Sequence, residues 1–283
     1  MKRTIACTSA LVPLLLAAAI PAAADSFTFT SGDPDGRMAT ATRPGGASGI
    51  EIESADDFIL KSPVNLTGAT LTGLLPAGAS VSSISNVVVE IYRVFPKDSV
   101  NPPSGNVPTR VNSPSDVAFD ERSVADGNLT MSATILNPSF TAANSVLNGI
   151  NPSPGQNTGG EGPVTGQEVQ ISVNFSTPFS LPADHYFFVP QVELSNGNFF
   201  WLSTTHPAIP PATVLTPDLQ EWIRNENLAP DWLRVGADIV GGTTFNTVFT
   251  LAGTTTPEPS AYLLMGSGLA LLAAWSRRKR IRK

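Results

Sequence analysis

The chain has 283 residues, with 17 Lys and Arg, 23 Asp and Glu and a formal net charge of −6. Most of the basic residues lie at the two ends, so residues 25–256 keep 9 basic against 22 acidic residues, a net charge of −13. Such a body repels nucleic acid and anionic lipid head groups, which excludes nucleic-acid binding, and it tolerates cations.

The first 24 residues predict a secretory signal peptide. Two basic residues are followed by an apolar stretch over residues 5–20, and three alanines end at Ala24. This order is typical of an export signal that is removed, so we expect cleavage between Ala24 and Asp25. The single cysteine, Cys7, lies inside the segment. The exported chain would therefore contain no disulfide, thiolate metal ligand or cysteine nucleophile.

Residues 25–253 are expected to form one all-β domain, because their number fits a single large sandwich or barrel. In residues 168–175, apolar and polar residues alternate, which predicts a strand with one buried and one wet face. Residues 87–95 are more continuously apolar and predict a central strand. Other runs rich in β-branched and aromatic residues predict further strands. These are residues 26–30, 38–43, 49–54, 57–60, 64–75, 129–136, 186–194, 199–203, 232–235 and 245–251.

Two places favour a short helix. The sequence Thr-Pro-Asp at 216–218 supplies a cap, a proline at the first helical position and an acidic first turn, which predicts one or two turns ending near Asn227. Residues 139–147 are a weaker candidate. Residues 97–116 and 151–166 are polar and rich in proline or glycine, so we expect long surface loops there.

One strand also resembles a known module. Residues 52–60, with the sequence Ala-Asp-Asp-Phe at their centre, resemble a strand of jelly-roll modules in secreted bacterial proteins. The resemblance implies a second strand at 88–93, an aromatic hairpin over 186–201 that turns at 195–198, and a closing Trp232 with a final strand. It implies an antiparallel, jelly-roll-like β-sandwich and nothing catalytic.

The acidic pairs could serve as metal ligands or simply shape the backbone. The sequence Asp-Pro-Asp-Gly at 33–36 could be half of a calcium site, but it lacks the other ligands of an EF-hand loop, and the same composition favours a β-turn. Asp56 and Asp57 would point to opposite faces of a strand, so we do not expect them to form one acid–base couple. One of them could cap a turn or bind a cation; alternatively both are polar residues at the start of a strand.

The histidines, the serines and the aromatic residues are further candidates for a catalytic or binding site. His185 and His206 could approach each other across the hairpin, but a zinc site would need a further ligand. No serine elbow or phosphate loop occurs, and the acidic residues are too many for a glycosidase pair to be nominated. Eight clustered aromatic residues could stack on sugar rings, although we expect most of them in the core. They are Tyr186, Phe187, Phe188, Phe199, Phe200, Trp201, Trp222 and Trp232.

The last thirty residues have three consecutive parts. The triplet Pro257, Glu258 and Pro259 precedes an apolar run, from which we expect a transmembrane helix over residues 261–276. The 15 uncharged residues of the run, 261–275, would give a helix of about 22 Å, short for a permanent anchor. The basic residues that follow would hold the C-terminus in the cytoplasm. They are Arg277, Arg278, Lys279, Arg280, Arg282 and Lys283.

This ending, residues 254–283, resembles the PEP-CTERM sorting signal of Gram-negative bacteria. The resemblance implies recognition by exosortase, with the membrane as a transient stop. We therefore expect an exported, non-enzymatic protein at the cell surface or in the extracellular polysaccharide matrix, with a structural or polysaccharide-binding role. A secreted glycan-acting hydrolase is the alternative. No cofactor is expected, and a structural calcium ion stays open.

Overall fold

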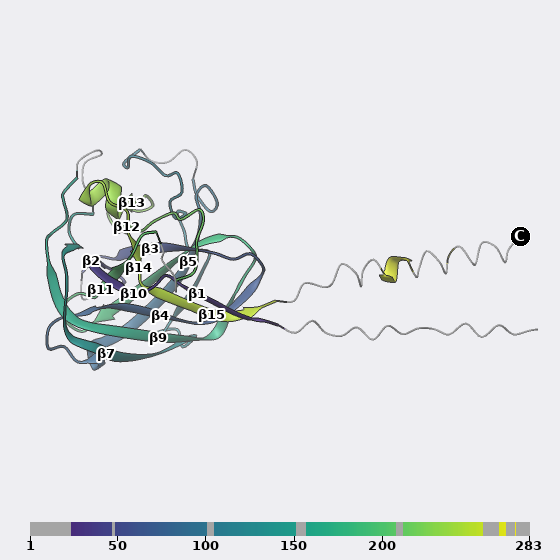
Figure 1. The fold of residues 1–283 in the computed structure, drawn as a ribbon, viewed down its shortest axis with the longest axis horizontal. Helices are drawn as coiled ribbons and strands as arrows, with labels where there is room; N and C mark the ends of the chain where they lie inside the picture. Colours follow the sequence, from purple (N-terminus) through teal and green to yellow (C-terminus); the bar gives the residue numbers. More distant parts are fainter. Residues whose placement is uncertain are drawn as a thin grey trace, which may run out of the picture. The chain divides into compact units, whose positions relative to one another are not determined.

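The computed structural model describes residues 24–46, 49–100, 105–150, 157–207, 212–256, 266–269 and 275. Residues 25–256 form one compact unit that contains two β-sheets (Figure 1). The hydrophobic clusters of the described residues all lie within this unit. The unit therefore buries a core of its own without residues from either end of the chain.

The larger sheet has nine strands and follows the order β1-β15-β4-β11-β2-β8, with β9 beside β4, β7 beside β9, and β14 beside β11. Its strand pairs are antiparallel except for β2 with β8, which is parallel. The strands are β1 (Ser26–Thr30), β2 (Pro34–Ala41), β4 (Val64–Leu75), β7 (Leu129–Ala142), β8 (Asn144–Val146), β9 (Val164–Leu181), β11 (Phe200–Thr204), β14 (Asn246–Thr247) and β15 (Phe249–Thr255).

The smaller sheet has six antiparallel strands in the order β13-β12-β3-β10-β5-β6. They are β3 (Ile52–Ile59), β5 (Ile84–Arg93), β6 (Asp120–Ser123), β10 (His185–Leu194), β12 (Trp222–Asn225) and β13 (Leu233–Arg234). Two short helical turns complete the unit, a 3-10 turn at Val81–Ser83 and a π turn at Val235–Val240.

The largest hydrophobic cluster joins the two sheets face to face. Phe188 of β10 stacks on Phe249 of β15 with 5.1 Å between ring centroids, and it meets Trp201 of β11 edge-on at 6.0 Å. All three side chains are fully buried. Each such side chain contributes roughly 1.5–3 kcal/mol on burial, so this contact is a main source of the attraction between the layers.

The predicted alternation in residues 168–175 is confirmed. Val169, Ile171, Val173 and Phe175 of β9 are buried, whereas the residues between them are half-buried or exposed. The continuously apolar stretch at 87–95 forms most of β5, which has a strand partner on each side, β10 and β6. The predicted loop at 97–116 contains no named strand in its described part.

Both helix predictions are wrong. Residues 222–225 form β12, in which Trp222 and Ile223 pair with β3 on one side and β13 on the other. Both side chains are buried, so strand pairing and packing outweigh the local helix signals. The Asp218 carboxylate caps only a local turn, accepting a hydrogen bond from the Gln220 N–H at 3.0 Å. Residues 139–142 lie in β7 and residues 144–146 lie in β8.

The predicted aromatic hairpin is also wrong, because β10 and β11 belong to different sheets. The chain crosses from one layer to the other between Leu194 and Phe200. Aromatic side chains of the two strands consequently face each other across the core, as the contact of Phe188 with Trp201 shows. The connectivity of a jelly roll stays a prediction.

In the described part of the chain, no helix reaches the length and apolarity that crossing a membrane requires. The signal peptide predicted at 1–24 lies outside the described residues except for Ala24. Most of the transmembrane helix predicted at 261–276 lies outside them too; residues 266–269 and 275 are helical.

Candidate functional site

The two ends of the compact unit leave it at the same edge. β1 and β15 pair antiparallel, with Ser26 opposite Thr254. The Asp25 N–H donates to Thr255 Oγ1 at 3.0 Å, and the Thr255 N–H donates to the Asp25 carbonyl at 2.8 Å. The Thr256 N–H donates to the Pro63 carbonyl at 2.8 Å. Ordered pairing of the backbone therefore extends to the residue directly before the Pro-Glu-Pro triplet.

The predicted processing residues divide between described and undescribed positions. Ala24 and Asp25 are exposed beside the end of β15, where a peptidase could reach the bond between them. Pro257, Glu258 and Pro259 lie outside the described residues, as does the basic tail. The cleavage site and the role of these residues stay predictions.

A second candidate is a cluster of carboxyl groups on the outer side of the six-stranded sheet. Side chains of paired residues on neighbouring strands share a face. Arg224 of β12 is opposite Glu53 of β3, and Glu90 of β5 is opposite Glu121 of β6. Between them, Gln191 of β10 donates from Nε2 to Glu90 Oε2 at 3.0 Å and to Glu51 Oε1 at 3.2 Å. We call these residues (Glu51, Glu53, Glu90, Glu121, Gln191 and Arg224) the acidic face.

Arg224 holds one end of the acidic face. Its guanidinium forms two hydrogen bonds with the Glu53 carboxylate, one of them at 3.1 Å, and donates to the Tyr92 hydroxyl at 2.8 Å. The Tyr92 hydroxyl in turn donates to Glu53 at 2.7 Å. The guanidinium also lies 4.3 Å from the centre of the Trp232 ring. These contacts hold the Glu53 carboxyl group in one position at the buried side of the cluster.

Among the described residues, Glu90 forms no ion pair with a cation. Burial, followed by the charges of Glu53, Glu121 and Glu51, raises the pKa of Glu90 to about 9. Burial and the neighbouring Glu53 also raise the pKa of Glu51. At neutral pH the Glu90 carboxyl thus keeps its proton and can donate a hydrogen bond, next to carboxylates that only accept.

The amide of Gln191 fixes the geometry of this cluster. Gln191 is 1 % exposed, and its Oε1 has no hydrogen-bond partner among the described residues. Glu51 and Glu90 are half-buried and Glu121 is exposed, so these carboxyl groups can meet a ligand from solvent. The acidic face consequently offers acceptors and one neutral donor side by side. The sequence did not predict this cluster. The signal it contains is the position of Glu51, Glu53 and Glu90, three charged residues within or next to runs of apolar residues that form strands.

Asp56 and Asp57 lie within β3 and are buried, which corrects their placement at the start of a strand. As predicted, they point to opposite sides of the sheet. Asp56 Oδ2 accepts from the Thr247 N–H at 2.6 Å, whereas Asp57 contacts His185 Nε2 at 2.5 Å and the Leu219 N–H at 2.9 Å. Burial first, and neighbouring carboxylates next, raise the pKa of both aspartates well above the usual range.

The two histidines have separate surroundings. Burial lowers the pKa of His185 to about 4, so the ring is neutral beside Asp57 at physiological pH. His206 lies 3.0 Å from Asn246 Oδ1 and 3.3 Å from Asp218 Oδ2. Within the described ranges, no group of three or more His, Cys, Asp or Glu side chains is arranged to hold a metal ion.

Asp33 lies directly before β2, and residues 34–36 are the first residues of that strand, so the segment does not form the predicted β-turn. Asp35 lies in β2 and accepts from Ser203 Oγ at 2.6 Å and from the Arg37 N–H at 3.0 Å. Gly36 has a φ of +68°, a conformation that favours glycine. The Asp35 carboxylate thus contributes through Oδ1 to the contact of β2 with β11, and Asp33 contributes through its backbone carbonyl, which accepts from Thr204 Oγ1 at 2.7 Å.

The clustered aromatic residues are core residues, as expected for most of them. Seven of the eight are buried, and Phe200 is half-buried. The indole N–H groups of Trp201, Trp222 and Trp232 each donate to a backbone carbonyl, at 2.8, 3.0 and 3.0 Å. These rings therefore offer no exposed platform for a sugar.

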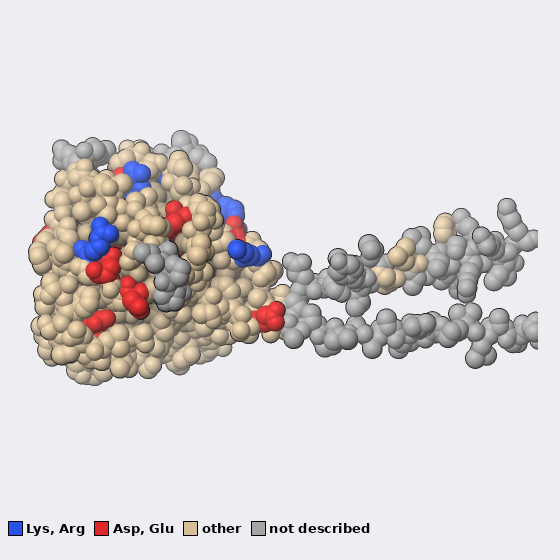
Figure 2. Space-filling model, in the orientation of Figure 1, with Lys and Arg blue, Asp and Glu red and all other residues tan. Residues whose placement is uncertain are grey.

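Most Arg and Lys side chains of the described residues form an ion pair with a carboxylate. On the face that Figure 2 shows, the basic side chains lie next to acidic ones and do not gather into a patch. Examples are the ion pairs of Lys97 with Asp184 and of Arg234 with Asp238.

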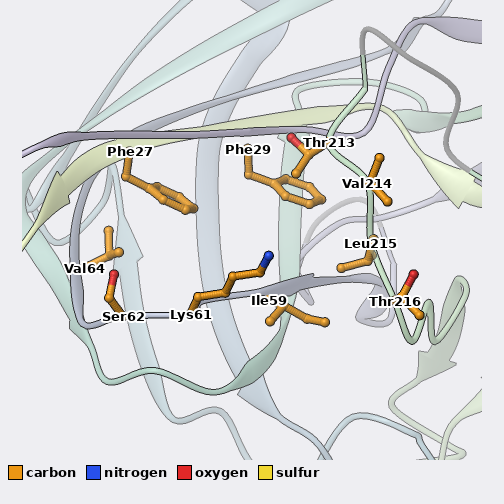
Figure 3. Close-up of a pocket in the computed structure, with 10 residues that line it drawn as sticks. All are labelled: Phe27, Phe29, Ile59, Lys61, Ser62, Val64, Thr213, Val214, Leu215 and Thr216. Carbon is orange, nitrogen blue, oxygen red and sulfur yellow. The ribbon is translucent and has the colours of Figure 1, made fainter.

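A pocket of about 470 Å³ lies beside β1 (Figure 3). Phe27 and Phe29 of β1 form one wall, and Val214 and Leu215 form another. The side chain of Lys61 extends into the space between them. Ser62, Thr213 and Thr216 add hydroxyl groups to a lining that is otherwise apolar, with Ile59 and Val64 completing it.

Comparison with known proteins identifies the end of the chain. Residues 255–280 match the family described as PEP-CTERM protein-sorting motif. The motif indicates that the chain is exported and that exosortase sorts it to the cell surface. No curated protein and no solved structure matches the chain.

Proposed function

We propose that this chain is a non-enzymatic protein that exosortase delivers to the cell surface or to the extracellular polysaccharide matrix. There its jelly-roll-like body would bind polysaccharide or serve as a structural component. The observation that carries this proposal is the sorting motif at residues 255–280, which begins where the folded body ends.

The geometry of the exit edge supports delivery by a membrane enzyme. Thr256 is held by Pro63, and only residues 257–260 separate it from the predicted membrane segment. Four extended residues span at most roughly 14 Å. The body would therefore stay close to the bilayer until the tail is cut, and the cut would release it.

The acidic face is our candidate for the polysaccharide site. Sugar hydroxyl groups both donate and accept hydrogen bonds, and the half-buried carboxyl groups of Glu51 and Glu90 provide both functions. The body has a net charge of −13, which repels an anionic polymer. We therefore expect a neutral polysaccharide as the ligand.

One observation favours the alternative of a glycan-acting hydrolase. Glycoside hydrolysis needs a carboxylic acid that keeps its proton and a second carboxylate that does not. Glu90, with its raised pKa, and the carboxyl group of Glu53, which pairs with Arg224, provide the two groups that this chemistry needs. The ion pair of Glu53 with Arg224 opposes it, because a carboxylate bound in this way is a weak base or nucleophile.

Sorting is tested by replacing Pro257, Glu258 and Pro259 with alanine in the native host and fractionating the cells. We expect the variant to stay in the membrane fraction at its larger, unprocessed mass. The matched control replaces Thr254, Thr255 and Thr256 with serine, which leaves the triplet intact. If the alanine variant is processed and located like the wild type, the tail is only an anchor.

Binding is tested on residues 25–256 with a glycan array that carries neutral and anionic polysaccharides. Glu51→Gln and Gln191→Met should each weaken binding of a neutral glycan by roughly five- to tenfold, the loss of about one hydrogen bond. Glu168→Gln is the control, since Glu168 is a half-buried glutamate of the other sheet. Release of reducing ends that Glu90→Gln abolishes would instead establish the hydrolase.

A further inference from the structure

We propose that the pocket beside β1 binds a small amphiphile with one apolar chain and one anionic group. The pocket measures about 470 Å³ and is partly open to solvent (Figure 3). Sites for small molecules are concave, mostly apolar, of about 300–1,000 Å³, and contain few polar groups that orient the ligand. The pocket has each of these properties, and the sorting function makes no use of it.

The walls of the pocket favour an apolar chain. Phe29 belongs to the core cluster, and Phe27 and Leu215 pack against that cluster while they remain partly exposed to the pocket. Ile59, at the end of β3, adds a further aliphatic side chain. An apolar chain placed among these four side chains would remove apolar surface from water on both partners, which stabilises the complex.

The wall formed by residues 213–216 is attached to β1. The Thr30 N–H donates to Thr213 Oγ1 at 2.9 Å, and the Thr213 N–H donates to the Thr30 carbonyl at 2.7 Å. These two hydrogen bonds tie the segment at 213–216 to β1. The pocket is therefore preformed, and a ligand would lose little free energy by ordering it.

Lys61 determines the charge of the ligand. Its side chain is exposed and extends into the pocket (Figure 3). Among the described residues, no carboxylate lies within ion-pair distance of Lys61, whereas Lys97, the other lysine of the body, pairs with Asp184. An ammonium group next to an apolar wall attracts an anion whose remaining part is apolar. A carboxylate or a phosphate monoester on a short acyl chain has this chemistry.

Calorimetric titration of residues 25–256 with octanoate, octylammonium and acetate tests the proposal. We expect octanoate to bind in the millimolar range or tighter, and acetate and octylammonium to bind at least about tenfold more weakly. Acetate lacks the apolar chain, and octylammonium carries the wrong charge. Equal affinity for octanoate and octylammonium, or no binding of octanoate, would overturn the proposal.

Two variants locate the binding. Lys61→Met should weaken octanoate roughly three- to tenfold without changing the far-ultraviolet circular dichroism spectrum, and Lys97→Met is the matched control that should bind like the wild type. Leu215→Asp introduces a charge into the partly exposed wall and should abolish binding. If Lys61→Met and Leu215→Asp both bind octanoate like the wild type, the ligand binds elsewhere and the pocket is refuted as its site.

Discussion

Removal of the Glu90 carboxyl group should stabilise the body at neutral pH. Burial of Glu90, and next the charges of Glu53, Glu121 and Glu51, raise its pKa from 4.5 to about 9 on folding. Between these two pH values the unfolded chain loses a proton that the folded chain keeps. The contribution of Glu90 to stability is therefore fully present below pH 4.5 and is lost as the pH rises toward 9. Glu90→Gln keeps a neutral side chain of the same shape at every pH.

The size of the effect follows from the same two pKa values. pH 7 lies about 2.5 units above the pKa of the unfolded glutamate, and each unit corresponds to about 1.4 kcal/mol. The upper limit at pH 7 is thus about 3 kcal/mol. Glu90 is half-buried, and water screens part of the repulsion, so we expect Glu90→Gln to be about 1–2 kcal/mol more stable than the wild type at pH 7.

Urea unfolding of residues 25–256 at pH 4.5, 6 and 8 measures this difference. Other groups, such as His185 with its lowered pKa, also make stability depend on pH, but they affect both proteins equally. The difference between the two proteins should be small at pH 4.5 and increase steadily to pH 8. Glu121→Gln serves as the exposed control and should gain less. A difference that does not change with pH would refute the raised pKa of Glu90.

Two further predictions follow from the same structure. Arg224→Met leaves the buried Glu53 carboxylate without its cation and should lower the free energy of unfolding in urea by about 3–5 kcal/mol. The double variant Glu53→Gln with Arg224→Met should lose clearly less stability. Equal losses would mean that the charge of Glu53 is not the cause. Mass spectrometry of the processed protein should find a C-terminus beyond Thr256, because the backbone of Thr255 and Thr256 is paired within the body. If four residues (Gly-Ser-Gly-Ser) are inserted after Thr256, the cleavage site should keep its distance from the Pro-Glu-Pro triplet and so move away from β15. A cleavage site within β15 would contradict this prediction.

Local patterns predicted the strands that bury one face. In β9 the alternation of Val169, Ile171, Val173 and Phe175 with polar residues is sufficient to predict the strand and its buried face, because one side of the strand packs on the core and the other faces solvent. The order of strands across the sheets is not local. β10 and β11 look like a hairpin in sequence, and only the packing of Phe188 on Trp201 across the core explains why they separate into two layers.

The helix predicted after Asp218 fails for a related reason. Cap, proline and acidic residues are weak preferences, each contributing about 1 kcal/mol or less. Burial of Trp222 and Ile223 between β3 and β13 stabilises the strand by more than that. The acidic face could not be predicted from local sequence either, because Glu53, Glu90 and Gln191 belong to three strands that lie far apart in the sequence.

The acidic face has a stability cost that bears on function. Glu51, Glu53 and Glu90 lie close to one arginine, and burial together with the remaining repulsion raises the pKa of Glu51 and Glu90. Apolar side chains in a sheet face of this kind would give an equal or more stable body. A purely structural role would gain nothing from these carboxyl groups, whereas a site that binds hydroxyl groups requires them. The cost therefore favours polysaccharide binding over a structural role alone, and the Glu51→Gln and Gln191→Met variants decide between the two.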